Sequence, residues 1–217
     1  MKRILLIALS LVFAISCHDD RNVNGPGIIE TNFEVKEYFK EELDKTRATL
    51  ASLMTEPCLV FPMITDIHYL ATTSICPELI DDTVNNMIDL SKDVHFDFLA
   101  CLGDLTQGNK SMSETEQEVK HVYAQFNKLG IPFYTCIGNH DTNIYYKVGD
   151  SYMKDHVFSL NQLFGLYISD IQGVTYDLSS MNGTNFYKDF PEFQIQWFLY
   201  RRNLQILYLN WKTILSN

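Results

Sequence analysis

The chain has 217 residues, of which 46% are hydrophobic and 20% are charged. This composition suits a single folded domain and argues against an intrinsically disordered protein. The formal net charge is -10, so a basic groove that follows a nucleic-acid backbone is not expected.

The N-terminus has the pattern of a secretory signal peptide. Lys2 and Arg3 precede an apolar stretch over 4–15 that is too short to span a bilayer as a stable helix. Small residues then lead into Cys17, which resembles the lipidated cysteine of a bacterial lipoprotein. The polar residues directly after Cys17 favour this interpretation over an ordinary cleaved signal with an incidental cysteine.

These features predict a signal peptide over 1–16, a tether over 17–32 and one domain over 33–217. They also predict export and attachment to a membrane through a lipid on Cys17 only. Export permits disulfides. However, Cys101 and Cys136 lie in apolar runs, where a buried thiol is expected.

The domain alternates predicted helices and strands. Apolar residues at helical spacing predict three helices, over 33–54, 77–92 and 113–129. Three continuous apolar runs predict buried strands, over 58–65, 96–102 and 131–137. Ser113 and Glu116 have the spacing of a capping box at the start of the third helix. This alternation indicates an α/β fold, in which a parallel sheet is connected by right-handed crossovers.

Three polar motifs directly follow the three predicted strands. They are Asp66-Ile67-His68, Gly103-Asp104 and Gly138-Asn139-His140-Asp141. Because ligand sites of such sheets form at the carboxyl ends of the strands, we expect the motifs to lie together. Oxygen and imidazole ligands bind divalent cations, and a carboxylate such as that of Asp104 can bridge two of them. Each motif alone fits a helix cap, a turn or a surface histidine, so the combination carries the prediction.

Together the motifs resemble the first three blocks of the calcineurin-like phosphoesterases, over roughly residues 59–141. The resemblance implies an α-β-β-α sandwich and a site for two divalent metal ions. Asp66 and His68 would bind the first ion. Asp104 would bridge both ions, and Asn139 would bind the second. Manganese, iron and zinc all suit these ligands.

The same resemblance implies hydrolysis of a phosphorylated substrate whose identity the sequence does not specify. His140 would act in catalysis, by stabilising the phosphoryl oxygens or by protonating the leaving group. Asp141 would orient the His140 ring. Water would attack phosphorus in line while the cations neutralise the developing charge.

The chain departs from the family pattern after the third motif. The family continues with a lone histidine and a Gly-His-x-His block, but this sequence has no histidine after His156. Residues 185–200 resemble a hairpin early in the second sheet, and the residues that follow match nothing expected there. We therefore expect an incomplete second sheet, and favour a frameshift or premature stop near residue 196 over a natural short homologue.

Two functions thus remain open. The first is an exported metal-dependent phosphoesterase. The alternative is a catalytically inactive truncated remnant or metal-binding lipoprotein. A third and weaker possibility is a lipid-anchored binding module that uses the aromatic residues of 145–176, for which a packed lid or core is preferred.

Overall fold

A computed structural model of the chain describes residues 7–10, 34–54, 59–72, 75–177, 186–190, 195–199 and 208–209. In its first part, strands and helices alternate as β1 (Ile7–Ser10), α1 (Glu37–Leu53), β2 (Val60–Ile64), α2 (Ile75–Ser91), β3 (Leu99–Cys101), α3 (Met112–Asn127) and β4 (Phe133–Thr135). Shorter elements follow. They are η1 (His140–Thr142), β5 (Lys147–Val148), β6 (Ser151–Tyr152), η2 (Lys154–His156), α4 (Leu160–Leu163), the π-helix η3 (Phe164–Ile168), β7 (Thr175–Tyr176), β8 (Phe186–Phe190), β9 (Ile195–Leu199) and β10 (Tyr208–Leu209).

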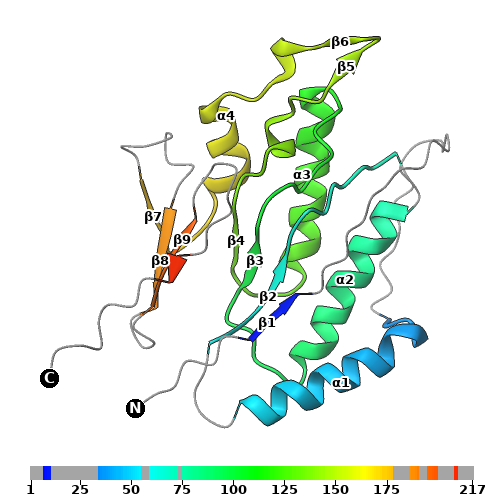
Figure 1. The fold of residues 1–217 in the computed structure, drawn as a ribbon, viewed down its shortest axis with the longest axis vertical. Helices are drawn as coiled ribbons and strands as arrows, with labels where there is room; N and C mark the ends of the chain where they lie inside the picture. Colours follow the sequence, from blue (N-terminus) through cyan, green and yellow to red (C-terminus); the bar gives the residue numbers. More distant parts are fainter. Residues whose placement is uncertain are drawn as a thin grey trace, which may run out of the picture.

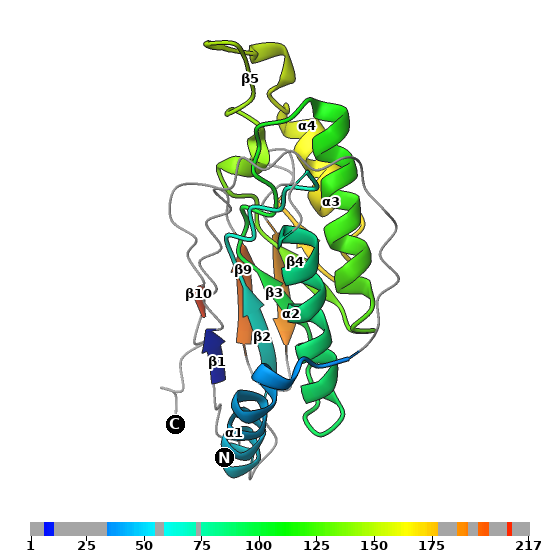
Figure 2. The same cartoon turned by 90° about the vertical axis from the view of Figure 1, so that its right-hand side faces the viewer.

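The central sheet is parallel, and its strand order β1-β2-β3-β4 is the order along the chain. Right-handed crossovers that always step in one direction place their helices on one face of a sheet. Accordingly α1, α2 and α3 lie on one side, and β7, β8 and β9 lie on the other (Figure 1). Figure 2 shows the molecule from the helix side.

The second sheet is antiparallel, with the order β10-β9-β8-β7, and its strands are two to five residues long. Phe186 of β8 is 2% exposed and belongs to the main core. The centroid of its ring lies 6.5 Å from that of Tyr134 on β4, so Phe186 packs between the two sheets. These features confirm the predicted α/β fold with two sheets, of which the second is small.

The three predicted helices are present as α1, α2 and α3, and the three predicted strands as β2, β3 and β4, with small shifts in their bounds. α3 begins at Met112 and is capped by Ser111, whose hydroxyl accepts from the Glu114 N–H while the Glu114 carboxylate accepts from the Ser111 N–H. The predicted capping box of Ser113 and Glu116 was therefore placed two residues too late. Both pairs have the required spacing, and only the backbone distinguishes them.

The edge strand β1 lies in the segment for which a signal peptide is predicted. It pairs in parallel with β2, from Ile7 opposite Val60 to Ser10 opposite Met63. Cleavage after residue 16 would remove β1 and leave β2 at the edge of the sheet. The signal peptide therefore stays a prediction from the sequence.

The cysteines differ in state. Cys101 and Cys136 are buried free thiols, which confirms their predicted packing as small apolar side chains. Burial raises the pKa of the Cys101 thiol to about 12, so it remains protonated. Cys76, near the start of α2, is disulfide-bonded. Among the described helices, none is long and apolar enough to cross a membrane.

Glu118 of α3 is an acidic side chain in the interior, only 4% exposed. One of its oxygens accepts from the Ala71 N–H at 2.9 Å, and no described group bonds to Oε2. Burial raises the pKa of Glu118 to about 7, against partly opposing effects of the Ala71 N–H and Lys110. The folded state therefore keeps a proton that the unfolded chain loses at lower pH.

We expect Glu118→Gln to become more stable relative to the wild type as pH rises. The contribution of wild-type Glu118 is largest below its unfolded pKa and is lost as pH rises through the folded pKa, a change of up to about 3 kcal/mol. Glutamine keeps an oxygen for Ala71 and does not titrate. Urea unfolding at pH 4.5 and pH 8 measures the change. A stability difference between variant and wild type that is equal at both pH values would contradict this role.

Candidate metal centre

The loops after β2 and β3 run side by side at the carboxyl end of the sheet. The Asp66 N–H donates to the Gly103 carbonyl at 3.1 Å, and the His68 N–H donates to the Asp104 carbonyl at 2.9 Å. These bonds continue the parallel pairing past the ends of the strands. The first two motifs are therefore neighbours, as the sequence predicts.

The loop after β4 joins them because glycine allows a very close approach. A Cβ atom on Gly138 would lie 2.1 Å from Asp104 Oδ1 and 2.5 Å from the Asp104 nitrogen. Gly103 has φ +99°, and a Cβ there would lie 2.6 Å from the Gly138 nitrogen. Both motif glycines are thus required for the contact between the second and third loops.

Three of the predicted ligand residues have left-handed backbone conformations. The φ angles are 53° at Asp66, 48° at His68 and 52° at Asp104. Such conformations are uncommon for residues other than glycine, cost of the order of 1 kcal/mol or more each, and cluster at functional sites. Here they turn the two loops sharply at the positions that present side chains to the site.

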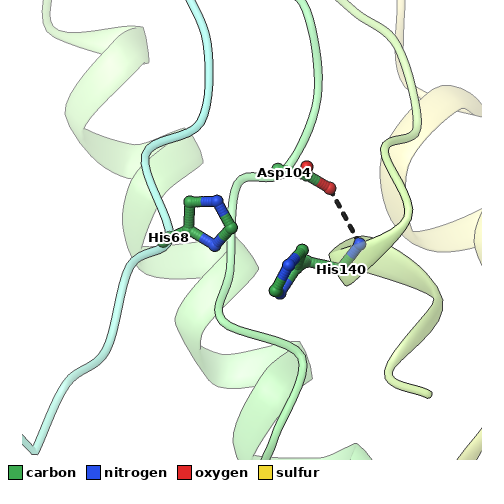
Figure 3. Close-up of side chains that lie close together, drawn as sticks. All are labelled: His68, Asp104 and His140. Carbon is green, nitrogen blue, oxygen red and sulfur yellow. Dashed lines mark hydrogen bonds between the residues drawn. The ribbon is translucent and has the colours of Figure 1, made fainter. Parts of the chain in front are cut away.

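His68, Asp104 and His140 form a group that could hold a metal ion (Figure 3). One potential ligand atom from each lies within 4.8 Å of the others. The two imidazole rings meet edge to face, with their centroids 4.2 Å apart. Asp104 is 6% exposed, and its Oδ1 accepts from the His140 N–H at 2.8 Å, which joins the second and third motifs.

The donor set fits a divalent cation. His68 Nδ1 is buried and no described group bonds to it, so it lacks the partner that a buried polar atom normally has. Burial and the nearby His140 lower the pKa of His68, which favours the neutral ring that binds metals. Carboxylate oxygen and imidazole nitrogen together suit manganese, iron and zinc.

Two further predicted ligands lie at the rim. Asp66 is half exposed, and its Oδ1 lies 3.8 Å from His68 Nε2. Its Oδ2 accepts from the Thr65 hydroxyl at 2.5 Å. Asn139 is exposed, and its side-chain amide donates to the Tyr145 hydroxyl at 2.9 Å. The structure thus brings His68, Asp104 and His140 together and places Asp66 and Asn139 beside them.

The ring of His140 is held by groups other than the predicted Asp141. Nδ1 lies 2.8 Å from the Gln107 carbonyl oxygen, and Tyr145 packs on the ring with centroids 4.3 Å apart. Because a carbonyl can only accept, Nδ1 carries the proton. In the neutral ring Nε2 is therefore the unprotonated nitrogen. Gln107 lies three residues after Asp104, close to a predicted ligand, but Tyr145 has no sequence signal that could have identified it.

Asp141 instead holds the backbone of two loops together. Its carboxylate is fully buried and accepts from the N–H groups of Gly138 and Asp104 at 2.8 Å and of Leu105 at 2.9 Å. Burial raises the pKa of Asp141 to about 6, although these N–H donors oppose the shift. The predicted contact with the His140 ring does not form, because both carboxylate oxygens are taken by backbone donors.

The other described histidines lie outside this group. His156 Nδ1 accepts from the Met112 N–H at the start of α3, and His121 stacks on Tyr69. His95 lies near Asp97 and is mostly exposed. None of them supplies the histidine ligands that the family pattern places downstream.

The family model of the calcineurin-like phosphoesterases matches residues 61–213, which is more than half of the chain. The chain therefore belongs to the calcineurin-like phosphoesterase family, a class of metal-dependent phosphoester hydrolases. The match continues past residue 200, where the sequence motifs alone had no counterpart. No curated protein and no solved structure matches the chain.

Proposed function

We propose that this chain hydrolyses phosphate esters at a site for two divalent metal ions. The convergence of His68, Asp104 and His140 at the carboxyl end of the parallel sheet carries the proposal. Asp66, His68 and Asp104 would hold the first ion. Asp104 and Asn139 would hold the second, with Asp104 between them.

When bound, such ions polarise the phosphoryl group and lower the pKa of water. The protein's own part is to orient the groups around the phosphorus. Asp141 fixes the backbone from which Asp104 projects. His140, held at Nδ1 by Gln107, has Nε2 available to exchange a proton with the leaving oxygen or to contact the phosphoryl oxygens.

A second candidate is a metal-binding protein without turnover. The sequence has no histidine after His156, so the downstream ligands of the family pattern are missing from it. Within these 217 residues, Asp104 and Asn139 would be the ligands of the second ion. A site with these two protein ligands would bind metal weakly and position water poorly.

One experiment separates the two candidates. The purified chain is stripped with a chelator and titrated with Mn²⁺, and metal binding and hydrolysis of an aryl phosphate are measured on the same samples. Turnover that rises with Mn²⁺ occupancy supports the enzyme. Binding without turnover supports the second candidate, and the absence of binding contradicts both.

We also propose that the protein is exported and anchored by a lipid on Cys17. The signal pattern of the N-terminus and the disulfide bond of Cys76 support this, because disulfides persist in oxidising compartments.

We expect metabolic labelling with a fatty-acid analogue to mark the wild-type protein and not Cys17→Ala. The mature wild-type chain is also expected to lack residues 1–16, which mass spectrometry of its N-terminus measures. A full-length wild-type chain without label would contradict the lipid anchor. It would also indicate that β1 remains in the sheet of the mature protein.

A further inference from the structure

Tyr145 contacts two residues of the candidate metal centre. Its hydroxyl accepts from Asn139 Nδ2 at 2.9 Å. Its ring packs on that of His140, with centroids 4.3 Å apart and planes inclined at 31°. Tyr145 is 36% exposed, so part of it remains accessible to solvent.

The backbone of Tyr145 is held by Gly108, in the loop that follows Asp104. The Tyr145 N–H donates to the Gly108 carbonyl at 3.1 Å. Gly108 has φ +65°, and a Cβ atom there would lie 2.1 Å from the His140 carbonyl oxygen. The same glycine therefore allows the close approach to His140 and accepts the hydrogen bond of the Tyr145 N–H. The short helix η1 (His140–Thr142) is capped by Asn143, whose φ of 61° turns the chain back toward the site.

An asparagine side chain can bind a metal ion only through its oxygen. The amide group has an oxygen acceptor and a nitrogen donor of nearly equal shape, and its orientation depends on which neighbours each of them finds. In the structure the Tyr145 hydroxyl accepts from Asn139 Nδ2, so Oδ1 is the amide atom left for an ion. Outer groups of this kind orient metal ligands and tune their affinity.

We propose that Tyr145 is a positioning residue that holds Asn139 with its oxygen toward the metal centre while its ring supports His140. This inference rests on the proposed function, in which Asn139 is a ligand of the second ion. The hydroxyl and the ring have separable tasks. The hydroxyl holds the Asn139 amide through its bond to Nδ2, and the ring limits rotation of the His140 imidazole.

Tyr145→Phe tests the hydroxyl while keeping the ring. We expect the affinity for the second Mn²⁺ to fall by about 10-fold, the lower end of what loss of an outer partner costs. Calorimetric titration and the spin-coupled signal of paired Mn²⁺ ions measure this without relying on turnover. Tyr152→Phe is the matched control, because Tyr152 is an exposed tyrosine of the β5–β6 hairpin, and its affinity should equal that of the wild type.

A second background isolates the orientation of the amide. In Asn139→Asp both side-chain oxygens can bind metal, so the added change Tyr145→Phe should cost less than about threefold. An equal loss in both backgrounds would overturn the orienting role.

Asn139→Ala separates this inference from the proposed function. If Asn139→Ala binds the second ion as well as the wild type, Asn139 is not a ligand and the proposed site is wrong. If Asn139→Ala weakens binding but Tyr145→Phe does not, the ligand assignment stands and only the positioning role of Tyr145 is refuted.

Discussion

Asp104→Asn is expected to lower metal-dependent turnover by at least about 100-fold, above what loss of an outer partner usually costs. Asp104 is the carboxylate shared by the two proposed ions, and an amide has only one ligand oxygen and no negative charge. The fold should survive, because asparagine has nearly the same shape and keeps an oxygen for the His140 N–H. Steady-state hydrolysis of an aryl phosphate with added Mn²⁺ measures the effect.

Asp97→Asn is the matched control for this prediction. The carboxylate of Asp97 also accepts a backbone N–H, that of Val60 at 2.8 Å, but it lies at the opposite end of the strands. We expect its turnover to equal that of the wild type. Equal activity of Asp104→Asn and Asp97→Asn would show that any hydrolysis does not use this site.

Asp141→Ala is expected to destabilise the metal-free protein by about 3–5 kcal/mol, because it leaves several buried N–H donors without an acceptor. The donors belong to both loops that Asp141 joins, at Gly138 on one side and at Asp104 and Leu105 on the other. Metal binding should weaken as a consequence, since the position of Asp104 depends on these bonds. Urea unfolding in the presence of a chelator measures the stability directly.

Asp155→Ala is the control for this loss, since Asp155 is an exposed aspartate of η2. Its stability should lie within about 0.5 kcal/mol of the wild type. If Asp141 acted only by orienting the His140 ring, Asp141→Ala would lower the activity and leave the urea midpoint unchanged. That outcome would contradict the structural role described above.

The meeting of the three motifs could be predicted from the sequence. Continuous apolar runs alternate with amphipathic segments, and this order places the residues after each strand at the same edge of a parallel sheet. His68, Asp104 and His140 lie far apart in the chain and do converge there. The prediction depends only on periodicity and chain topology, which a single sequence displays directly.

The contacts within the site could not be predicted in the same way. Asp141 follows His140 in the chain, which suggested contact with its ring, yet the turn at η1 directs the carboxylate to backbone N–H groups. Tyr145 reaches Asn139 only because the loop turns back after Asn143. Both results depend on loop dihedral angles, for which hydrophobic periodicity contains no information.

The left-handed backbone at Asp66, His68 and Asp104 also restricts which residues could occupy these positions. Aspartate, asparagine and histidine are the residues other than glycine that most often adopt positive φ, whereas β-branched residues are strongly disfavoured. The same three residue types offer oxygen or nitrogen to a cation. Apart from glycine, the backbone of these loops therefore favours residue types that can also bind a cation, and it disfavours threonine or valine at these positions.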